Sequence, residues 1–195
     1  MTRAIYVMTA SLAILGTCIP ALIHPAPRLI WNATASTPTG LYALHTIGQL
    51  HVRDLVVAWP PEPIAAFLES GGFLPKGVPL LKQVMALLGQ TICRINNIVT
   101  IDGIAIGAAH ERDHLGRPLP RWTGCRRLRA DEVFLMNPNV PDSLDGRYFG
   151  PFPFSAIAAR AVPLWTDDAS QSRFISHRPG NTLAQSVSKS THQEN

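Results

Sequence analysis

The sequence has few charged residues, few lysines and few cysteines. Only 15% of its 195 residues are charged, whereas soluble domains average about 25%. Three cysteines are too few for a disulfide-dense miniprotein, and a hydrophobic content of 46% excludes an intrinsically disordered chain. The 17 prolines and 14 glycines argue against a coiled coil or a helical bundle. The lysines are Lys76, Lys82 and Lys189.

The apolar excess is concentrated at the N-terminus. Residues Ala4–Ile23 carry no charge, and at about 1.5 Å per residue a helix of this length crosses the roughly 30 Å hydrocarbon core of a bilayer. The sequence therefore predicts a single transmembrane helix in the inner membrane, with residues 1–24 as the anchor. Arg3 favours a cytoplasmic N-terminus, which places the remaining chain across the membrane, in the periplasm if the source is a Gram-negative bacterium. A cleaved secretory signal is the alternative, and the remaining chain is exported in either case.

The C-terminal segment has the opposite character. Residues 166–195 are rich in serine, threonine, glutamine and asparagine and have no apolar periodicity. This composition predicts a disordered polar tail. Residues 29–165 then remain as one folded domain, because this length is too short for two ordinary domains.

Short apolar and β-branched runs predict a mostly β domain between these ends. One short helix is expected at Ile64–Ser70, after Pro63 and before a glycine pair. Pro163 in the last strand predicts that this strand lies at an edge or bends. Many short strands with turns at this spacing are typical of an antiparallel barrel or folded sheet. Strands are expected at Leu50–Trp59, Pro79–Leu88, Thr91–Val99, Thr100–Ile104 (strand, turn, strand), Glu132–Met136 and Ala156–Trp165.

Two of the cysteines, Cys93 and Cys125, flank a loop-rich segment. In an oxidising compartment they can form one disulfide, which would contribute roughly 3–4 kcal/mol by restricting the unfolded chain. Two free thiols are the alternative. Two cysteines alone do not make a metal site, so we expect no metal.

Ser36 lies in the segment W-N-A-T-A-S-T-P-T-G-L-Y (Trp31–Tyr42), whose proline and glycine favour turns. Turn formation alone explains this composition, but such a turn also presents one hydroxyl at its mouth. A serine needs a base to become a nucleophile, and none of the histidines stands in a motif with an orienting acid. Lys82 lies in an apolar strand, where burial would lower its pKa and let the neutral amine take the Ser36 proton. A lysine that points out of a half-buried strand is the alternative.

A third segment, P-D-S-L-D-G-R-Y-F-G-P (Pro141–Pro151), is rich in turn-forming residues. Turn chemistry explains most of its composition without a function. Asp145 and Arg147 are two residues apart, so on a strand they would share a face and form an ion pair.

The net charge of +4 and the pI of about 9.3 allow contact with anionic lipid. A basic cluster surrounds Cys125, but no aromatic platform or helix motif accompanies it. We therefore interpret it as a solvated basic face and expect no nucleic-acid partner. The cluster consists of Arg121, Arg126, Arg127 and Arg129.

Taken together, these segments resemble the signal peptidase I family of serine–lysine proteases, and within it the TraF-type conjugative-transfer peptidases. The resemblance covers about residues 4–165. Each motif alone is weak, but their order and joint presence are specific. General leader peptidases carry methionine after the nucleophile, and Thr37 and Pro38 in that place favour the TraF-type branch. The motifs are the N-terminal apolar segment, N-A-T-A-S-T-P-T-G-L-Y (Asn32–Tyr42), G-V-P-L-L-K-Q-V (Gly77–Val84), G-R-P-L-P-R-W-T-G-C (Gly116–Cys125) and D-S-L-D-G-R-Y-F-G-P (Asp142–Pro151).

The resemblance implies roles for residues of the motifs Asn32–Tyr42 and Gly77–Val84. Ser36 is similar to the family's nucleophile, and Lys82 to its general base. The Thr34 hydroxyl matches a position that forms the oxyanion hole together with the Ser36 backbone N–H. The family's fold, a mostly antiparallel β structure with a barrel-like core, agrees with the strands expected from the sequence.

Other roles are implied near the end of the domain. Ser143 matches a residue that orients the lysine, and Asp145 and Arg147 match a supporting ion pair. Gly146 stands where the family usually has a serine, which leaves no side chain for a role at that position. The resemblance implies no cofactor.

The resemblance also implies a substrate. TraF-type enzymes are thought to mature the conjugative pilin precursor for type IV secretion and plasmid transfer, with either water or the pilin's own N-terminal amine releasing the acyl-enzyme. The expected partners are therefore the membrane and a pilin precursor or other exported preprotein. A general signal peptidase is one alternative, and a non-catalytic anchored β-domain that scaffolds a secretion channel is another.

Overall fold

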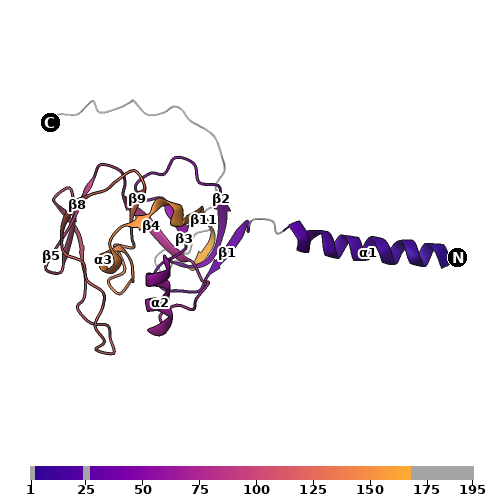
Figure 1. Cartoon of the computed structure of the whole chain (residues 1–195), viewed down its shortest axis with the longest axis horizontal. Helices are drawn as coiled ribbons and strands as arrows, with labels where there is room; N and C mark the ends of the chain where they lie inside the picture. Colours follow the sequence, from indigo (N-terminus) through magenta and orange to yellow (C-terminus); the bar gives the residue numbers. More distant parts are fainter. Residues whose placement is uncertain (1–2, 24–26, 168–195) are drawn as a thin grey trace, which may run out of the picture.

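The N-terminal apolar segment forms α1 (Arg3–Ile23) in the computed structural model, which describes residues 3–23 and 27–167. This helix lies apart from the strands (Figure 1). Its described side chains are exposed, and the hydroxyls of Thr9 and Thr17 donate to carbonyl oxygens one turn earlier. The predicted helix is confirmed, but the predicted membrane span is not: in the described part of the chain, no helix has both the length and the apolar character needed to cross a membrane.

The strands of the described residues form two antiparallel sheets, so the predicted mostly β fold is confirmed. The larger sheet has seven strands in the order β1-β2-β11-β3-β4-β9-β10, and the smaller has four in the order β7-β6-β5-β8. The larger sheet consists of β1 (Leu29–Asn32), β2 (Thr39–His45), β3 (Leu55–Ala58), β4 (Leu80–Ala86), β9 (Glu132–Met136), β10 (Phe152–Pro153) and β11 (Ile157–Asp167). The smaller sheet consists of β5 (Thr91–Ile95), β6 (Ile98–Ile101), β7 (Ile104–Ala108) and β8 (Gly124–Arg127), and lies at the left in Figure 1.

The predicted short helix is α2 (Glu62–Ser70). It begins two residues before the predicted start because Pro63 lies in the first turn, where a missing N–H leaves no intrahelical bond unmade. Two shorter helical segments, α3 (Gly146–Phe149) and η1 (Phe154–Ala156), were not predicted. Of these three segments, only α2 is long enough to leave an apolar pattern in the sequence.

Several predicted strand limits differ from the structure for local reasons. The strand expected from Leu50 begins only at Leu55, because a tight turn precedes it: Arg53 has φ 78°, and the Asp54 carboxylate accepts from the His51 N–H. Pro163 lies in the part of β11 that pairs with β2 alone, next to a bulge. Strand β9 matches its prediction to the residue.

The predicted C-terminal tail is only partly described. Thr166 and Asp167 belong to β11, and the remainder of the tail lies outside the described residues. The domain limits 29–165 stay a prediction.

Strand β4 runs through the middle of the core. Leu80 and Val84 pack with Leu68 of α2 on one face, while Leu81 packs with Val57 on the other. Side chains two apart on a strand share a face, so Lys82 lies on the same face as Leu80 and Val84. A third cluster, which includes Ile92 and Phe134, joins the smaller sheet to β4 and β9.

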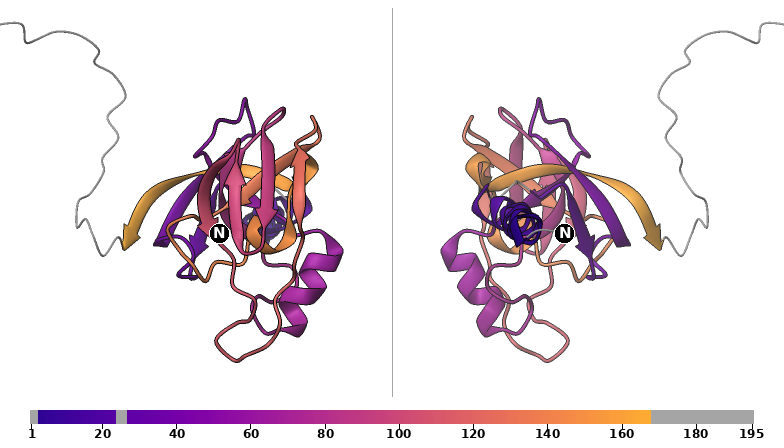
Figure 2. Two further views of the ribbon diagram at one scale, coloured as in Figure 1. Left: turned by 90° about the vertical axis from the view of Figure 1, so that its left-hand side faces the viewer. Right: turned by 90° about the vertical axis from the view of Figure 1, so that its right-hand side faces the viewer.

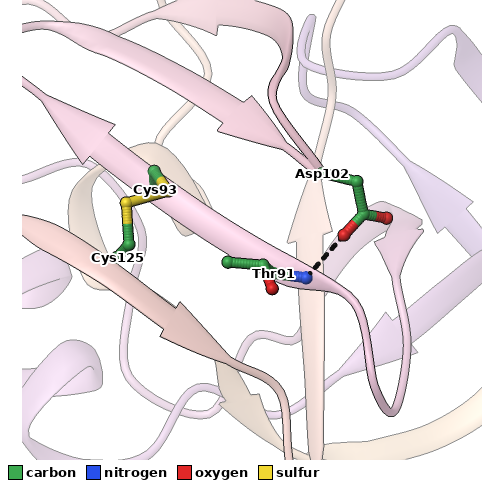
Figure 3. Close-up of a disulfide and its surroundings, with 4 residues drawn as sticks. All are labelled: Thr91, Cys93, Asp102 and Cys125. Atoms are coloured by element: carbon green, nitrogen blue, oxygen red, sulfur yellow. Dashed lines mark hydrogen bonds between the residues drawn. A yellow bond between two sulfur atoms is a disulfide. The ribbon is translucent and has the colours of Figure 1, made fainter.

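The smaller sheet carries a disulfide between Cys93 and Cys125, which are paired across β5 and β8 (Figure 3). At the start of β5, the Thr91 N–H donates to the Asp102 carboxylate at 2.8 Å. These two connections hold β5 to both of its neighbours. The disulfide also fixes the end of the segment 109–123, which precedes β8.

Candidate active site

Ser36 lies in the loop between the paired strands β1 and β2. Asn32, at the end of β1, holds this loop: its amide donates to the carbonyl oxygens of Thr34 and Thr37, each at 2.9 Å. The Ser36 hydroxyl is half-buried and lies 3.4 Å from Thr34 Oγ1. Thr34 Oγ1 itself donates to Asn32 Oδ1 at 2.8 Å. The Thr34 hydroxyl therefore has to turn away from Asn32 before it can donate to an oxyanion.

Lys82 is buried, with only 2% of its surface exposed, so it does not point out of the strand. Its Nζ donates to Ser143 Oγ at 2.6 Å. Burial lowers the pKa of Lys82 from 10.5 to about 8; the charge of Asp145 raises this pKa and that of Arg147 lowers it. At pH 7 about one molecule in ten therefore carries a neutral amine, which is the form that accepts a proton.

Asp145 and Arg147 form a fully buried ion pair beside Lys82. The guanidinium contacts both carboxylate oxygens, with Nε–Oδ1 at 3.0 Å and Nη2–Oδ2 at 2.9 Å. Arg147 also donates to the carbonyl of Val140 at 2.6 Å, which ties down the segment that carries Ser143. Paired charges of this kind are retained in a core only when their remaining bonds are satisfied, and here they are.

Asn137 is a site residue that the sequence interpretation missed. It is buried and follows β9 directly. Its amide donates to the Ser36 carbonyl at 2.6 Å and to the Leu81 carbonyl at 3.1 Å. The only signal in the sequence was an asparagine between an apolar strand and a proline, which is also typical of a strand end.

Ser36, Lys82 and Ser143 line one cavity of about 490 Å³. Apolar side chains of α2 and the segment after it form one wall, and residues of the segment 109–123 form another. Arg117 holds that segment against α2, since it donates to the Gly71 carbonyl at 2.8 Å and lies over the Phe73 ring. Figure 2 shows this loop beside α2. The cavity is large enough to take several side chains of a peptide.

Among residues 3–23 and 27–167, no three histidine, cysteine, aspartate or glutamate side chains are grouped so as to hold a metal ion. The chemistry available in the cavity is that of a half-buried hydroxyl, a buried amine and a second hydroxyl bonded to it. This is the set of groups that covalent catalysis by a serine needs.

Comparison with known proteins identifies the family. The family model described as signal peptidase, peptidase S26, matches residues 1–165. The chain belongs to this signal peptidase family. The resemblance stated from the motifs is thereby confirmed, and the family is one of serine peptidases.

Individual relatives of this signal peptidase family point to one branch of it. The chain is 34% identical to the "Probable conjugal transfer protein TraF" of Sinorhizobium fredii over 81% of its own length and 86% of that protein. It is 32% identical to the "Conjugal transfer protein TraF" of Agrobacterium fabrum (70% and 82%) and 33% identical to a "Plasmid transfer protein TraF" of Escherichia coli (71% and 76%). A crystal structure of a signal peptidase I from Enterococcus faecalis matches with TM-score 0.35 and 15% identity, over 59% of this chain and 98% of that one.

Proposed function

We propose that this protein is a serine endopeptidase with a Ser36–Lys82 dyad, which matures the pilin precursor of a conjugative transfer system. The observation that carries the proposal is the buried Lys82 amine. Its pKa is lowered to about 8, and it opens on the same cavity as Ser36. The names of the TraF relatives support the conjugative substrate.

The proposed acylation step uses only groups that line the cavity. Lys82 takes the Ser36 proton while Ser36 Oγ attacks the carbonyl carbon of the scissile peptide bond. The Ser36 backbone N–H and the Thr34 hydroxyl donate to the resulting oxyanion. When the C–N bond breaks, the protonated Lys82 gives its proton to the departing amine, which leaves an ester on Ser36.

Deacylation follows the same steps with a new nucleophile. Lys82 takes a proton from water, or from an N-terminal amine of the substrate, as this group attacks the ester. The ester bond breaks, and Ser36 recovers a proton from Lys82. Water gives a trimmed linear product, whereas the amine gives a cyclic one that is one water lighter.

Ser143 and the Asp145–Arg147 pair support the base in this proposal. Ser143 Oγ accepts a bond from Lys82 Nζ and so aims the amine into the cavity. The ion pair holds the backbone on which Ser143 stands. The domain is proposed to work on the periplasmic side of the cytoplasmic membrane, where a pilin precursor arrives.

The test is the mass of a co-expressed pilin subunit in cells that make wild-type protein, Ser36→Ala or Lys82→Ala. Wild type is expected to give a shortened subunit, and both variants to reduce processing more than about 10³-fold. Matched controls are Ser70→Ala and Lys76→Ala, since both residues are exposed. Normal processing by both dyad variants would disprove the dyad.

A further inference from the structure

Asn137 connects every part of the proposed dyad. It stands directly after β9, whose Met136 is paired with Gln83 of β4. Continuing this antiparallel register by one residue places Asn137 opposite Lys82. Pro138 follows and has no N–H to donate, so the strand ends there and the Asn137 side chain is free to bond outside the ladder.

The Asn137 side chain bonds to both neighbours of Lys82. Its Nδ2 donates to the Leu81 carbonyl at 3.1 Å, and its Oδ1 accepts from the Gln83 N–H at 3.2 Å. Together these bonds replace the ladder contacts that β9 no longer supplies at this point. They fix the backbone on either side of Lys82, and so the direction in which its side chain leaves β4.

The same amide also holds the loop of the nucleophile. Nδ2 donates to the Ser36 carbonyl at 2.6 Å and lies 3.1 Å from Thr37 Oγ1, whose hydroxyl in turn donates to the Leu81 carbonyl at 3.1 Å. The Ser36 loop and β4 are thus joined through one buried side chain and one threonine. Both Ser36 and Lys82 lie one residue away from the Thr37–Leu81 bond.

The Asn137 backbone bonds to the ion pair. Its N–H donates to Asp145 Oδ2 at 3.0 Å, and its carbonyl accepts from Arg147 Nη2 at 3.1 Å. Asn137 therefore contacts the nucleophile's residue, both neighbours of the base, and both members of the supporting pair. Among the described residues it is the one whose hydrogen bonds reach all of these.

We infer that Asn137 is a positioning residue, which sets the distance between the Ser36 hydroxyl and the Lys82 amine. This inference rests on the proposed function. The amide meets both requirements of the site, because it donates to the Ser36 carbonyl and accepts from the Gln83 N–H. A carboxylate at this position accepts but does not donate, so it faces the Ser36 and Leu81 carbonyls without a proton between them.

The inference predicts a loss in rate rather than in binding. Misplacement of a reacting group by about 1 Å costs about 10²-fold in rate. For Asn137→Ala and Asn137→Asp, kcat for cleavage of a pilin-derived peptide is therefore expected to fall about 10²-fold, with KM nearly unchanged. Asn139→Ala and Asn139→Asp are the matched controls, since Asn139 is exposed and lies two residues away; they should retain wild-type kcat.

The experiment separates positioning from folding and from the dyad itself. Thermal unfolding gives the folded fraction of each variant, and kcat is expressed per folded molecule. If kcat stays within about threefold of wild type, or if both Asn137 variants fail to fold while the Asn139 variants fold, the positioning role is wrong. A Ser36→Ala enzyme that cleaves like wild type would instead overturn the proposed function, so the two failures are distinguishable.

Discussion

Replacing Lys82 by methionine is expected to change how the stability of the protein depends on pH. Methionine keeps an unbranched apolar stem and removes the amine. Because one pKa unit corresponds to about 1.4 kcal/mol, lowering the Lys82 pKa from 10.5 to about 8 costs the folded state about 3 kcal/mol while the amine is charged.

The sign follows from proton binding in the two states. Well below pH 8 the lysine is protonated in nearly all folded and unfolded molecules, so almost the full cost is present. Between pH 8 and 10.5 the unfolded state binds more protons, and the free energy of unfolding therefore rises with pH. The wild type should gain about 3 kcal/mol relative to Lys82→Met between pH 7 and pH 11.

Urea unfolding followed by tryptophan fluorescence measures this difference. Taking wild type minus variant at each pH cancels the titrating groups that do not interact with Lys82. The bond from Lys82 to Ser143 is made only by the wild type and stays in this difference, so the quantity compared is the change of the difference with pH. Both proteins carry Cys18→Ser to prevent thiol exchange at alkaline pH. Lys76→Met is the control. The hydrogen bond and the charge of Glu62 raise the Lys76 pKa, so the free energy of unfolding of wild type cannot rise with pH relative to this variant. A flat difference for Lys82→Met would refute the buried, readily neutralised amine.

Three further variants test the fold around the dyad. Asp145→Asn leaves the buried Arg147 without its ionic partner, so it should lower the free energy of unfolding by about 3–5 kcal/mol. It also removes a charge that raises the Lys82 pKa, so the acid limb of the pH–rate profile should move to lower pH. Gly146→Ser should lower Tm, because a Cβ there would lie 2.7 Å from both the Leu135 carbonyl and the Phe134 ring. Such overpacking costs about 1–3 kcal/mol. The control Gly48→Ser, whose Cβ would have no atom within 4 Å, should leave Tm unchanged. The Cys93→Ser/Cys125→Ser double variant removes a disulfide between residues 32 apart. Its free energy of unfolding in urea should fall by roughly 3–4 kcal/mol. For each variant, an unchanged unfolding midpoint would contradict the contact that the substitution removes or disturbs.

The sequence predicts a structural feature best where that feature depends only on residues next to one another in the chain. Strand β9 is a continuous apolar run that ends at Asn137-Pro138, so its limits could be predicted to the residue. Gly146 stands at a position where the motif of the resembling family usually has a serine. The structure supplies the reason, since Phe134 and Leu135 fill the space that a side chain would need.

Features that depend on how separate elements meet could not be predicted. The positions that Asn137 bonds follow from the register of β9 against β4 and from the fold of the Ser36 loop, neither of which periodicity specifies. The Thr34 hydroxyl is a similar case. Its bond to Asn32 is a detail of loop conformation, and it shows that an oxyanion role requires a rotation that the motif does not reveal.

Acylation of Ser36 with Lys82 as its base can be observed by trapping the intermediate. A reaction of full-length protein with a pilin-derived peptide is quenched in acid within one turnover, digested, and mapped by mass spectrometry. We expect an acyl adduct on the peptide that contains Ser36 with wild type, and none with Lys82→Ala. Cleavage that proceeds at the wild-type rate in Ser36→Ala, or an adduct on another residue, would contradict this expectation.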